Sequence, residues 1–319
     1  TLAKFPFHCL QLAMATERRA AFDVGSGATK CYIAEVDPAA GTIGKEFFAQ
    51  EVPVNFALAY KSSPDETLSD SIQDEGIAVL RGFLAECEKF EVAKSSAVAT
   101  EVFRKARNGA DYLARVQKEL GLELRLVRQE EEARIGFLTA AAFREGDLKD
   151  VLCWDSGGAS FQITQQTEDG SALNSYLGCL GTGISAAHLA EVQGRSLAEV
   201  ATLNPVTKAD AEELVIRLKG TLSEVPEWLR GACVTAIGGQ NSIFRNCSDY
   251  VGNRSFNLEG ARRTLDATLD HTDEEIAEVF CKVERCEPAS LVVPKICLLV
   301  AVMEHCGMSA VRFQYAIGS

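Results

Sequence analysis

The sequence predicts an α/β protein made of two related domains that face each other across a cleft. Its 319 residues exceed the length of one ordinary core and fit two domains. Strand and helix patterns alternate along the chain, which is typical of mixed sheets covered on their faces. The stretch FDVGSGATKCYIAEVD (residues 22–37) aligns with WDSGGASFQITQQTED (residues 154–169) at a constant offset of 132 residues. One supersecondary unit is therefore used twice.

The first unit opens with an apolar strand, a turn of small residues and a second strand. Asp37 and Pro38 then begin a turn into a third strand. A long helix follows, because apolar side chains recur there at helical spacing. The expected strands are 20–24, 30–36, 43–52, 96–99 and 123–127, and the expected helices are 69–90, 109–120 and 130–143.

The second unit again runs from strands into helices. Its strands begin at residue 151 and continue to about residue 176, and Gly238 and Gly239 open one of its helices. The remaining expected elements are helices over 184–191, 207–219, 258–269, 272–283 and 292–304 and strands over 232–237 and 310–315.

The repeat also divides the chain. We expect domain I over residues 17–146 and domain II over residues 147–319, with the packing of the last segment on domain I left open. Residues 1–16 differ from the rest and are treated as an N-terminal extension. His8 and Gln11 interrupt its apolar segment, which argues against a secretory signal.

The composition restricts the partners. A formal net charge of -13 and a pI near 4.9 argue against nucleic acid and anionic membrane surfaces as partners. The longest apolar stretch, residues 291–303, contains Pro294 and Lys295 and is too short to span a bilayer, so we expect a core helix. The eleven cysteines show no CxxC pair or zinc spacing, which favours buried thiols and a cytoplasmic location.

The two small-residue turns favour phosphate binding. Without a Cβ, backbone N–H groups can approach an anionic oxygen closely. An aspartate just before each turn, Asp23 or Asp155, supplies a hard oxygen ligand for Mg²⁺ or another divalent cation, or positions water. A single such turn is more often a tight hairpin, but its repetition favours the phosphate interpretation. The candidate phosphate-binding residues of these turns are Gly25, Ser26, Gly27, Gly157, Gly158, Ala159 and Ser160.

Five segments in order resemble the exopolyphosphatase and guanosine pentaphosphate phosphohydrolase (Ppx/GppA) family. They are DVGS (23–26), ATEVFRKARN (99–108), EEAR (131–134), DSGGAS (155–160) and IGG (237–239). The resemblance extends from about Phe22 to Tyr315. It implies two duplicated ribonuclease H-like domains of the actin-like ATPase superfold, and it adds Gly238 and Gly239 to the expected phosphate site.

The resemblance also selects the catalytic base. Glu130, Glu131 and Glu132 begin a predicted helix, where carboxylates commonly complement the helix dipole. Consecutive helical residues point about 100° apart, so at most one of the three faces a cleft squarely. The matching family position implies that Glu132 is the base that activates the attacking water, and Asp155 is the second candidate catalytic residue, expected to organise metal or water.

Two basic residues are candidate phosphate ligands. Arg104 belongs to the densest basic cluster of an acidic chain, and that cluster reads equally well as a solvated helix end. The matching family position implies that Arg104 clamps a phosphate through bidentate hydrogen bonds. Lys30 follows Asp23 by seven residues, where many family members carry a cationic or imidazole side chain.

Gln162 departs from the family pattern. The family carries glutamate there, and that acid helps to hold metal and water. Glutamine keeps a carbonyl oxygen but loses the charge, so Gln162 is at most a weakened ligand beside Asp23 and Asp155. The chain also lacks the long C-terminal helical extension of larger members, so we expect short polyphosphate chains rather than long ones.

The leading hypothesis is therefore a phosphohydrolase that cleaves a terminal phosphoanhydride of short polyphosphate or of a guanosine penta- or tetraphosphate-type nucleotide. The alternative is a regulatory protein that binds a phosphorylated ligand with little turnover, motivated by Gln162. A sugar or acid kinase of the same superfold is a third reading, and Glu132 argues against it. The expected partner is a phosphorylated small molecule, and a homodimer is left open.

Overall fold

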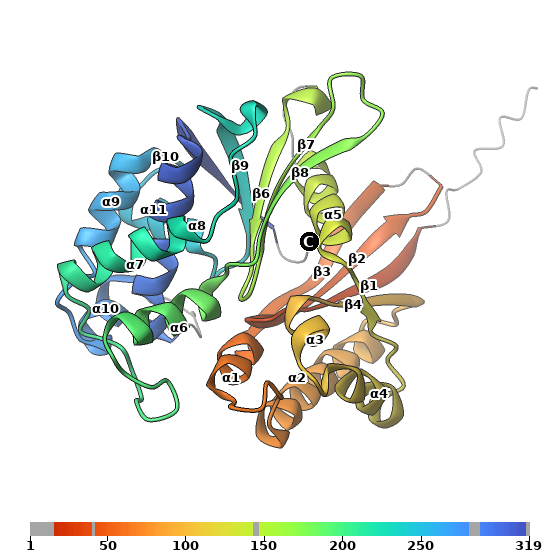
Figure 1. Cartoon of the computed structure of the whole chain (residues 1–319). Helices are drawn as coiled ribbons and strands as arrows, with labels where there is room; N and C mark the ends of the chain where they lie inside the picture. Colours follow the sequence, from red (N-terminus) through yellow and green to blue (C-terminus); the bar gives the residue numbers. More distant parts are fainter. Residues whose placement is uncertain (1–15, 40–41, 143–146, 281–287, 317–319) are drawn as a thin grey trace, which may run out of the picture.

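The computed structural model describes residues 16–39, 42–142, 147–280 and 288–316. The chain forms two mixed β-sheets with their helices, one from each half of the sequence (Figure 1). The predicted two-part α/β architecture is confirmed. Residues 1–15, most of the expected N-terminal extension, lie outside the described residues.

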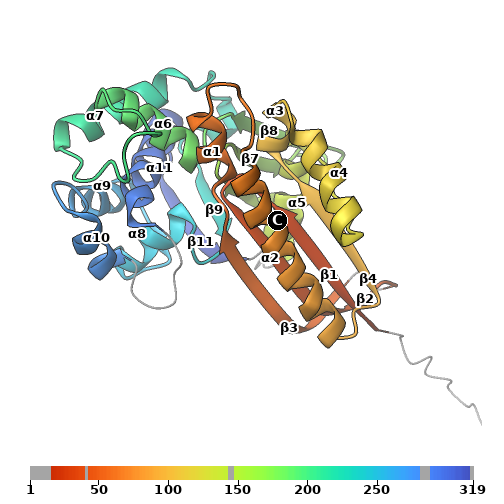
Figure 2. The ribbon, with the colours of Figure 1, turned by 90° about the horizontal axis from the view of Figure 1, so that it is seen from below.

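The first sheet has the strand order β3-β2-β1-β4-β5. Antiparallel β1, β2 and β3 are followed by β4 and β5, which run parallel to β1. Helices α2 and α4 cover one face and bury apolar side chains against β1 and β2 (Figure 2). The elements are β1 Glu17–Val24, β2 Ala28–Asp37, β3 Thr42–Pro53, α1 Phe56–Ser62, α2 Asp70–Lys89, β4 Lys94–Ala99, α3 Glu101–Lys105, α4 Gly109–Leu120 and β5 Arg125–Leu126.

The second sheet repeats this plan with the order β10-β11-β9-β6-β7-β8. Antiparallel β6, β7 and β8 are again joined by parallel strands, here β9 and β11. The elements are α5 Gln129–Ala142, β6 Leu152–Ser156, β7 Phe161–Gln166, β8 Leu173–Gly178, α6 Thr182–Val192, α7 Lys208–Gly220, β9 Cys233–Gly238, α8 Ile243–Val251, β10 Ser255–Phe256, α9 Leu258–Asp266, α10 Asp273–Phe280, α11 Val292–Cys306 and β11 Ala310–Tyr315, with 3₁₀ turns at Leu148–Asp150, Glu227–Leu229 and Ala289–Leu291.

The strand register confirms the internal repeat. In the first turn the N–H of Gly25 donates to the carbonyl of Ala28 at 2.9 Å, and in the second the N–H of Gly157 donates to Ser160 at the same distance. Each acceptor lies 132 residues from its counterpart. Asp23 pairs with Lys30 across its hairpin, and Asp155 pairs with Gln162. Lys30 and Gln162 therefore hold equivalent positions in the two units.

Helices cover both faces of the second sheet. Helix α5 packs on one face, against β6 to β9, and forms a small core with Cys153 and Ile237. On the other face, Trp154 and Phe161 join the core built by α6, α7, α8, α9 and α11. The span Ala289–Cys306 is long and apolar enough to cross a membrane by length and composition, but 78% of it is buried in this core. Helix α11 is therefore a buried core helix, as the sequence predicted.

Some local predictions were incomplete. The strand expected over 123–127 has only two residues, β5, and short α1, α3 and β10 were not anticipated. The helix expected over 272–283 is α10, and its last three predicted residues lie outside the described residues. Helix α5 belongs to the sequence range of domain I but packs on the second sheet. β11 also belongs to the second sheet, where it pairs with β9. The division at residues 146 and 147 stays a prediction.

Candidate active site

The two aspartate turns meet in one cleft between the sheets. The cleft is open to solvent and is lined by residues of both halves of the sequence. Of the described candidate site residues, Arg104 does not line it. Those that do are Asp23, Gly25, Ser26, Gly27, Lys30, Glu132, Asp155, Gly157, Gly158, Ala159, Ser160, Gln162, Gly238 and Gly239.

The two turns approach each other so closely that a side chain does not fit at Gly158. A Cβ on Gly27 would lie 3.2 Å from Cα of Gly158, and a Cβ on Gly158 would clash with the backbone nitrogen of Gly27. Segments that follow each hairpin hold the turns in place. The N–H of Ala57 donates to the carbonyl of Ser26 at 2.7 Å, and the N–H of Gly183 donates to that of Gly158 at 2.8 Å. Backbone of both domains therefore borders the same small space.

The turn serines are oriented by protein donors. Oγ of Ser26 accepts a hydrogen bond from the N–H of Val102 at 3.1 Å, and Oγ of Ser160 accepts one from Nε2 of Gln162 at 3.2 Å. Both serines are buried. Because each oxygen already accepts, its own hydrogen can donate to an oxygen in the cleft.

Glu132 is the glutamate of the α5 first turn that faces the cleft. Its neighbour Glu130 is exposed, and Glu131 forms an ion pair with Arg125 at the surface. Gly136, one helical turn after Glu132, lies against Asp155, and a Cβ there would be 3.4 Å from the Asp155 carboxylate. The helix thus brings Glu132 and Asp155 to the same wall of the cleft.

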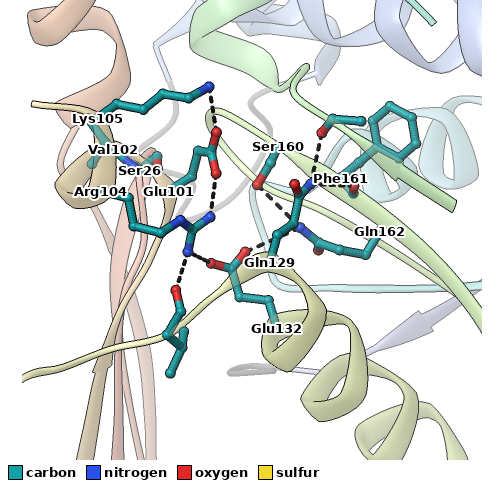
Figure 3. Close-up of polar contacts among 12 residues, drawn as sticks. Ser26, Glu101, Val102, Arg104, Lys105, Gln129, Glu132, Ser160, Phe161 and Gln162 are labelled. Atoms are coloured by element: carbon teal, nitrogen blue, oxygen red, sulfur yellow. Dashed lines mark hydrogen bonds and ion pairs between the residues drawn. The ribbon is translucent and has the colours of Figure 1, made fainter. Parts of the chain in front are cut away.

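Arg104 holds Glu132 from behind the cleft. Its Nη1 lies 2.6 Å from Oε1 of Glu132 and also donates to the carbonyl of Val127, while Nη2 pairs with Glu101 (Figure 3). Lys105 adds a second contact to Glu101 at 2.5 Å. The guanidinium is therefore engaged by two carboxylates and a carbonyl. A phosphate clamp by Arg104 would require these contacts to rearrange, and that role stays a prediction.

Burial shifts the protonation of Glu132. Removal from water raises the pKa of its carboxyl to about 7, with further upward contributions from Asp155 and Asp23, and the hydrogen bond and charge of Arg104 oppose the rise. A carboxyl with this pKa exchanges a proton near neutral pH. That property is expected of a general base.

Lys30 lies in a row of carboxylates. In the sheet register it is directly opposite Asp23 on β1 and Glu51 on β3. Its Nζ is 3.2 Å from Oδ2 of Asp23. Burial alone would lower the pKa of Lys30, but Asp23, Glu51 and Asp155 more than offset this and raise it. The neighbouring carboxylates therefore favour the charged form of Lys30.

Gln162 contacts the proposed base. Its Nε2 donates to Oε2 of Glu132 and to Oγ of Ser160, each at 3.2 Å (Figure 3). Glu132 thus accepts from Arg104 on one oxygen and from Gln162 on the other. The hydrogen bond from the amide nitrogen of Gln162 helps to orient the carboxylate of Glu132.

The residues expected to hold Mg²⁺ do not fit a resident metal ion as they are arranged. Carboxylates are suitable ligands, but the ammonium of Lys30 already lies beside Asp23. Gln162 directs its amide nitrogen toward Glu132. Within the described ranges, no group of three or more His, Cys, Asp or Glu side chains could hold a metal ion.

Two further charged residues line the cleft and were harder to foresee. Glu51 lies near the end of β3, and Lys295 lies near the start of apolar α11, where it donates to the carbonyl of Asn241 at 2.5 Å. For Lys295, the sequence signal of a functional position was a charged residue inside an apolar stretch. Oε2 of Glu51, Oγ of Ser156 and Oδ1 of Asn241 are buried with no hydrogen-bond partner in the described part of the chain. Such atoms are commonly satisfied by a ligand or water.

Comparisons with known proteins agree with this geometry. Residues 47–313 match the model of the Ppx/GppA phosphatase family. "Exopolyphosphatase 1" of Mycobacterium tuberculosis is 35% identical over 77 residues, which are 24% of this chain and 22% of that protein. The chain therefore matches about a fifth of the length of that curated relative.

Solved structures show the same fold. A Ppx/GppA family member of Aquifex aeolicus superposes with a TM-score of 0.66 at 19% identity, covering 95% of this chain and 97% of that one. An exopolyphosphatase of Cytophaga hutchinsonii gives a TM-score of 0.69 at 15% identity, covering 94% and 95%.

Proposed function

The chain belongs to the Ppx/GppA phosphatase family, and from this premise we propose that it is a phosphohydrolase. The proposed reaction removes a terminal phosphate from short polyphosphate or from a guanosine penta- or tetraphosphate-type nucleotide. One observation carries the proposal: Glu132, with a pKa of about 7, lines the same cleft as both aspartate turns. A kinase of the same superfold would be expected to take its base from another position.

In the proposed mechanism, the turns hold the phosphoryl group. Backbone N–H groups of the glycine turns and the hydroxyls of Ser26 and Ser160 are suited to donate to phosphoryl oxygens. Their close approach would fix the group between the domains. Lys30 contributes positive charge beside Asp23 in the same cleft. These donors would stabilise the negative charge that develops on the phosphoryl group in the transition state.

Glu132 would then take the proton from the attacking water. Arg104 favours the ionised form of Glu132, and Gln162 fixes the orientation of its second oxygen. The new oxygen–phosphorus bond forms as the bond to the bridging oxygen breaks, and the rest of the chain leaves as the shortened phosphate. No step of this mechanism is assigned to a metal ion.

Turnover of a defined substrate tests the proposal. Linear tripolyphosphate and a guanosine 5′-triphosphate 3′-diphosphate would be incubated separately with the full chain, and orthophosphate would be measured over time. We expect release from at least one of them. Absence of release from both, with binding of neither, would contradict the proposal.

A second candidate function is that of a phospho-ligand sensor with little turnover. Both oxygens of Glu132 accept hydrogen bonds from the protein, which restricts its access to water. Tight binding of the same compounds without release would favour this function. Recovery of hydrolysis in Gln162→Glu would favour it further, and substantial turnover by the native protein would contradict it.

A further inference from the structure

Lys295 is a buried cation that the proposed mechanism does not use. It belongs to the apolar helix α11, its exposed fraction is 7%, and it lines the cleft. Its Nζ donates at 2.5 Å to the carbonyl of Asn241, in the turn that joins β9 to α8. Burial of a charged group costs free energy, and an apolar side chain would suit the rest of this helix better. The lysine charge therefore points to a function in the cleft.

Ser156 reaches the same turn from strand β6. Residues two apart in a strand share one face of the sheet, so Ser156 lies on the face of Trp154. That face packs in the core to which α8 and α11 belong. Asp155 pairs with Ile237 on β9, and Ser156 therefore comes level with Gly238. Strand β6 and helix α11 thus bring a hydroxyl and an ammonium toward one turn.

The chemistry of this part of the cleft suits an oxygen anion. Oγ of Ser156 is buried and has no hydrogen-bond partner in the described part of the chain, and it lines the cleft together with Lys295. A hydroxyl can donate to an anionic oxygen, and an ammonium adds charge to such a hydrogen bond. A Cβ on Gly239 would clash with the carboxylate of Glu51 from the first sheet. An anion is therefore expected beside Ser156 and Lys295 rather than at Gly239.

We propose that Lys295 and Ser156 form a second phosphoryl subsite, which holds the phosphoryl group on the leaving side of the scissile bond. The first subsite, between the turns of Ser26 and Ser160, would hold the group that is transferred to water. Ser156 directly precedes the turn over residues 157–160, so the two subsites adjoin. The assignment of a leaving side rests on the proposed phosphohydrolase, whereas the subsite itself requires only a ligand with two linked phosphoryl groups.

Binding of one and of two linked phosphoryl groups tests the inference. Isothermal titration calorimetry at pH 7 would compare orthophosphate with methylenediphosphonate, whose bridging carbon prevents hydrolysis. The proteins are the native chain, Lys295→Met and the control Lys208→Met, which alters an exposed lysine of α7 in the same half of the chain. Lys295→Met should lose at least about tenfold in affinity for methylenediphosphonate and at most about twofold for orthophosphate, because one charge-assisted hydrogen bond is removed. The control should match the native chain.

Thermal unfolding separates a binding role from a structural one. An apolar side chain of similar length suits apolar α11, so Lys295→Met should keep or raise the native Tm. If that variant is unfolded, Ser156→Ala carries the binding test, with an expected loss of about threefold or more for methylenediphosphonate alone. A lower Tm with native affinity for methylenediphosphonate would assign Lys295 a purely structural role and overturn the inference.

The binding test and the turnover test fail independently. Absence of phosphate release would contradict the proposed hydrolysis, but the subsite would stand if Lys295→Met still weakens methylenediphosphonate binding. Equal affinity of the native chain and Lys295→Met for methylenediphosphonate would overturn the subsite even if the native chain hydrolyses its substrate. An equal loss for both probes, or no binding of methylenediphosphonate by the native chain, would also overturn it.

Discussion

The amide nitrogen of Gln162 lies 3.2 Å from the carboxylate of Glu132, which joins the sequence position that departs from the family pattern to the proposed base. The internal repeat makes Gln162 the counterpart of Lys30, and each side chain contacts a carboxylate in the cleft. Both halves of the molecule thus use this strand position to support an acid. The loss of charge at residue 162 consequently affects Glu132 directly.

The variant Gln162→Glu should raise the pKa of Glu132, because a second carboxylate would replace a hydrogen-bond donor. We expect the pH at which kcat/KM is half-maximal to move up by about one unit, with lower activity at pH 7. The pH profile of phosphate release measures this shift. Gln165→Glu, on the alternate face of β7, is the matched control and should leave the profile unchanged. A downward shift in Gln162→Glu would contradict the assigned contact.

Stability should also depend on the protonation of Glu132. A glutamate carboxyl in water has an ordinary pKa of 4.5, whereas that of Glu132 in the folded chain is about 7, so the folded chain binds the proton more tightly. The contribution of this carboxyl to stability is complete below pH 4.5 and is lost as the pH rises through about 7. Replacement by the uncharged Glu132→Gln should therefore stabilise the protein by about 1–3 kcal/mol more at pH 8 than at pH 4. Urea unfolding at both pH values measures the difference, and equal effects would refute the elevated pKa.

The approach of the two turns can be tested with neighbouring glycines. A Cβ on Gly158 would clash with the backbone of Gly27, whereas a Cβ on Gly157 would meet Ser160 at an ordinary 3.6 Å. Gly158→Ala should cost about 1–3 kcal/mol of unfolding free energy and reduce phosphate-ligand binding. Gly157→Ala is the control and should be tolerated in denaturant unfolding. Comparable losses in both variants would show that the turns do not depend on this approach.

Arg104 should be important for stability, unlike the exposed Arg125. Arg104→Met would leave Glu132 without its cation in a mostly buried site, so a loss of about 3 kcal/mol is expected. Arg125→Met breaks the exposed pair with Glu131 and should cost less than about 1 kcal/mol. Urea unfolding at pH 8, where Glu132 is ionised, compares the two variants. Equal costs would argue against a structural role for the Arg104 pair.

Periodic and repeated features were predictable from the sequence. The two aspartate hairpins, long α2 and buried α11 follow from apolar spacing and from the repeat. Short α1 and α3 were missed because five to seven residues carry little periodic signal and such helices depend on tertiary contacts. Helix α5 lies within the sequence range predicted for domain I, but it packs on the second sheet.

The sequence predicted which residues form the candidate site, but it did not predict the contacts among them. Fourteen of the fifteen candidate residues line one cleft: the repeat places both aspartate turns at strand ends, and the resemblance adds Glu132 on α5. Spacing could not show that Arg104 pairs with Glu132, since 28 residues separate them. Nor could it show that Lys30 would lie between Asp23 and Glu51, because that depends on the register of three strands.

The central claim is that Glu132 activates water for phosphoanhydride hydrolysis. The most direct measurement is the initial rate of orthophosphate release at pH 8 from a substrate that the native chain hydrolyses, for Glu132→Gln and for Glu130→Gln, which alters an exposed glutamate of the same helix turn. We predict a loss of about 10²–10⁴-fold for Glu132→Gln, with ligand binding retained, and a native rate for Glu130→Gln. Native turnover by a folded Glu132→Gln variant would contradict the claim.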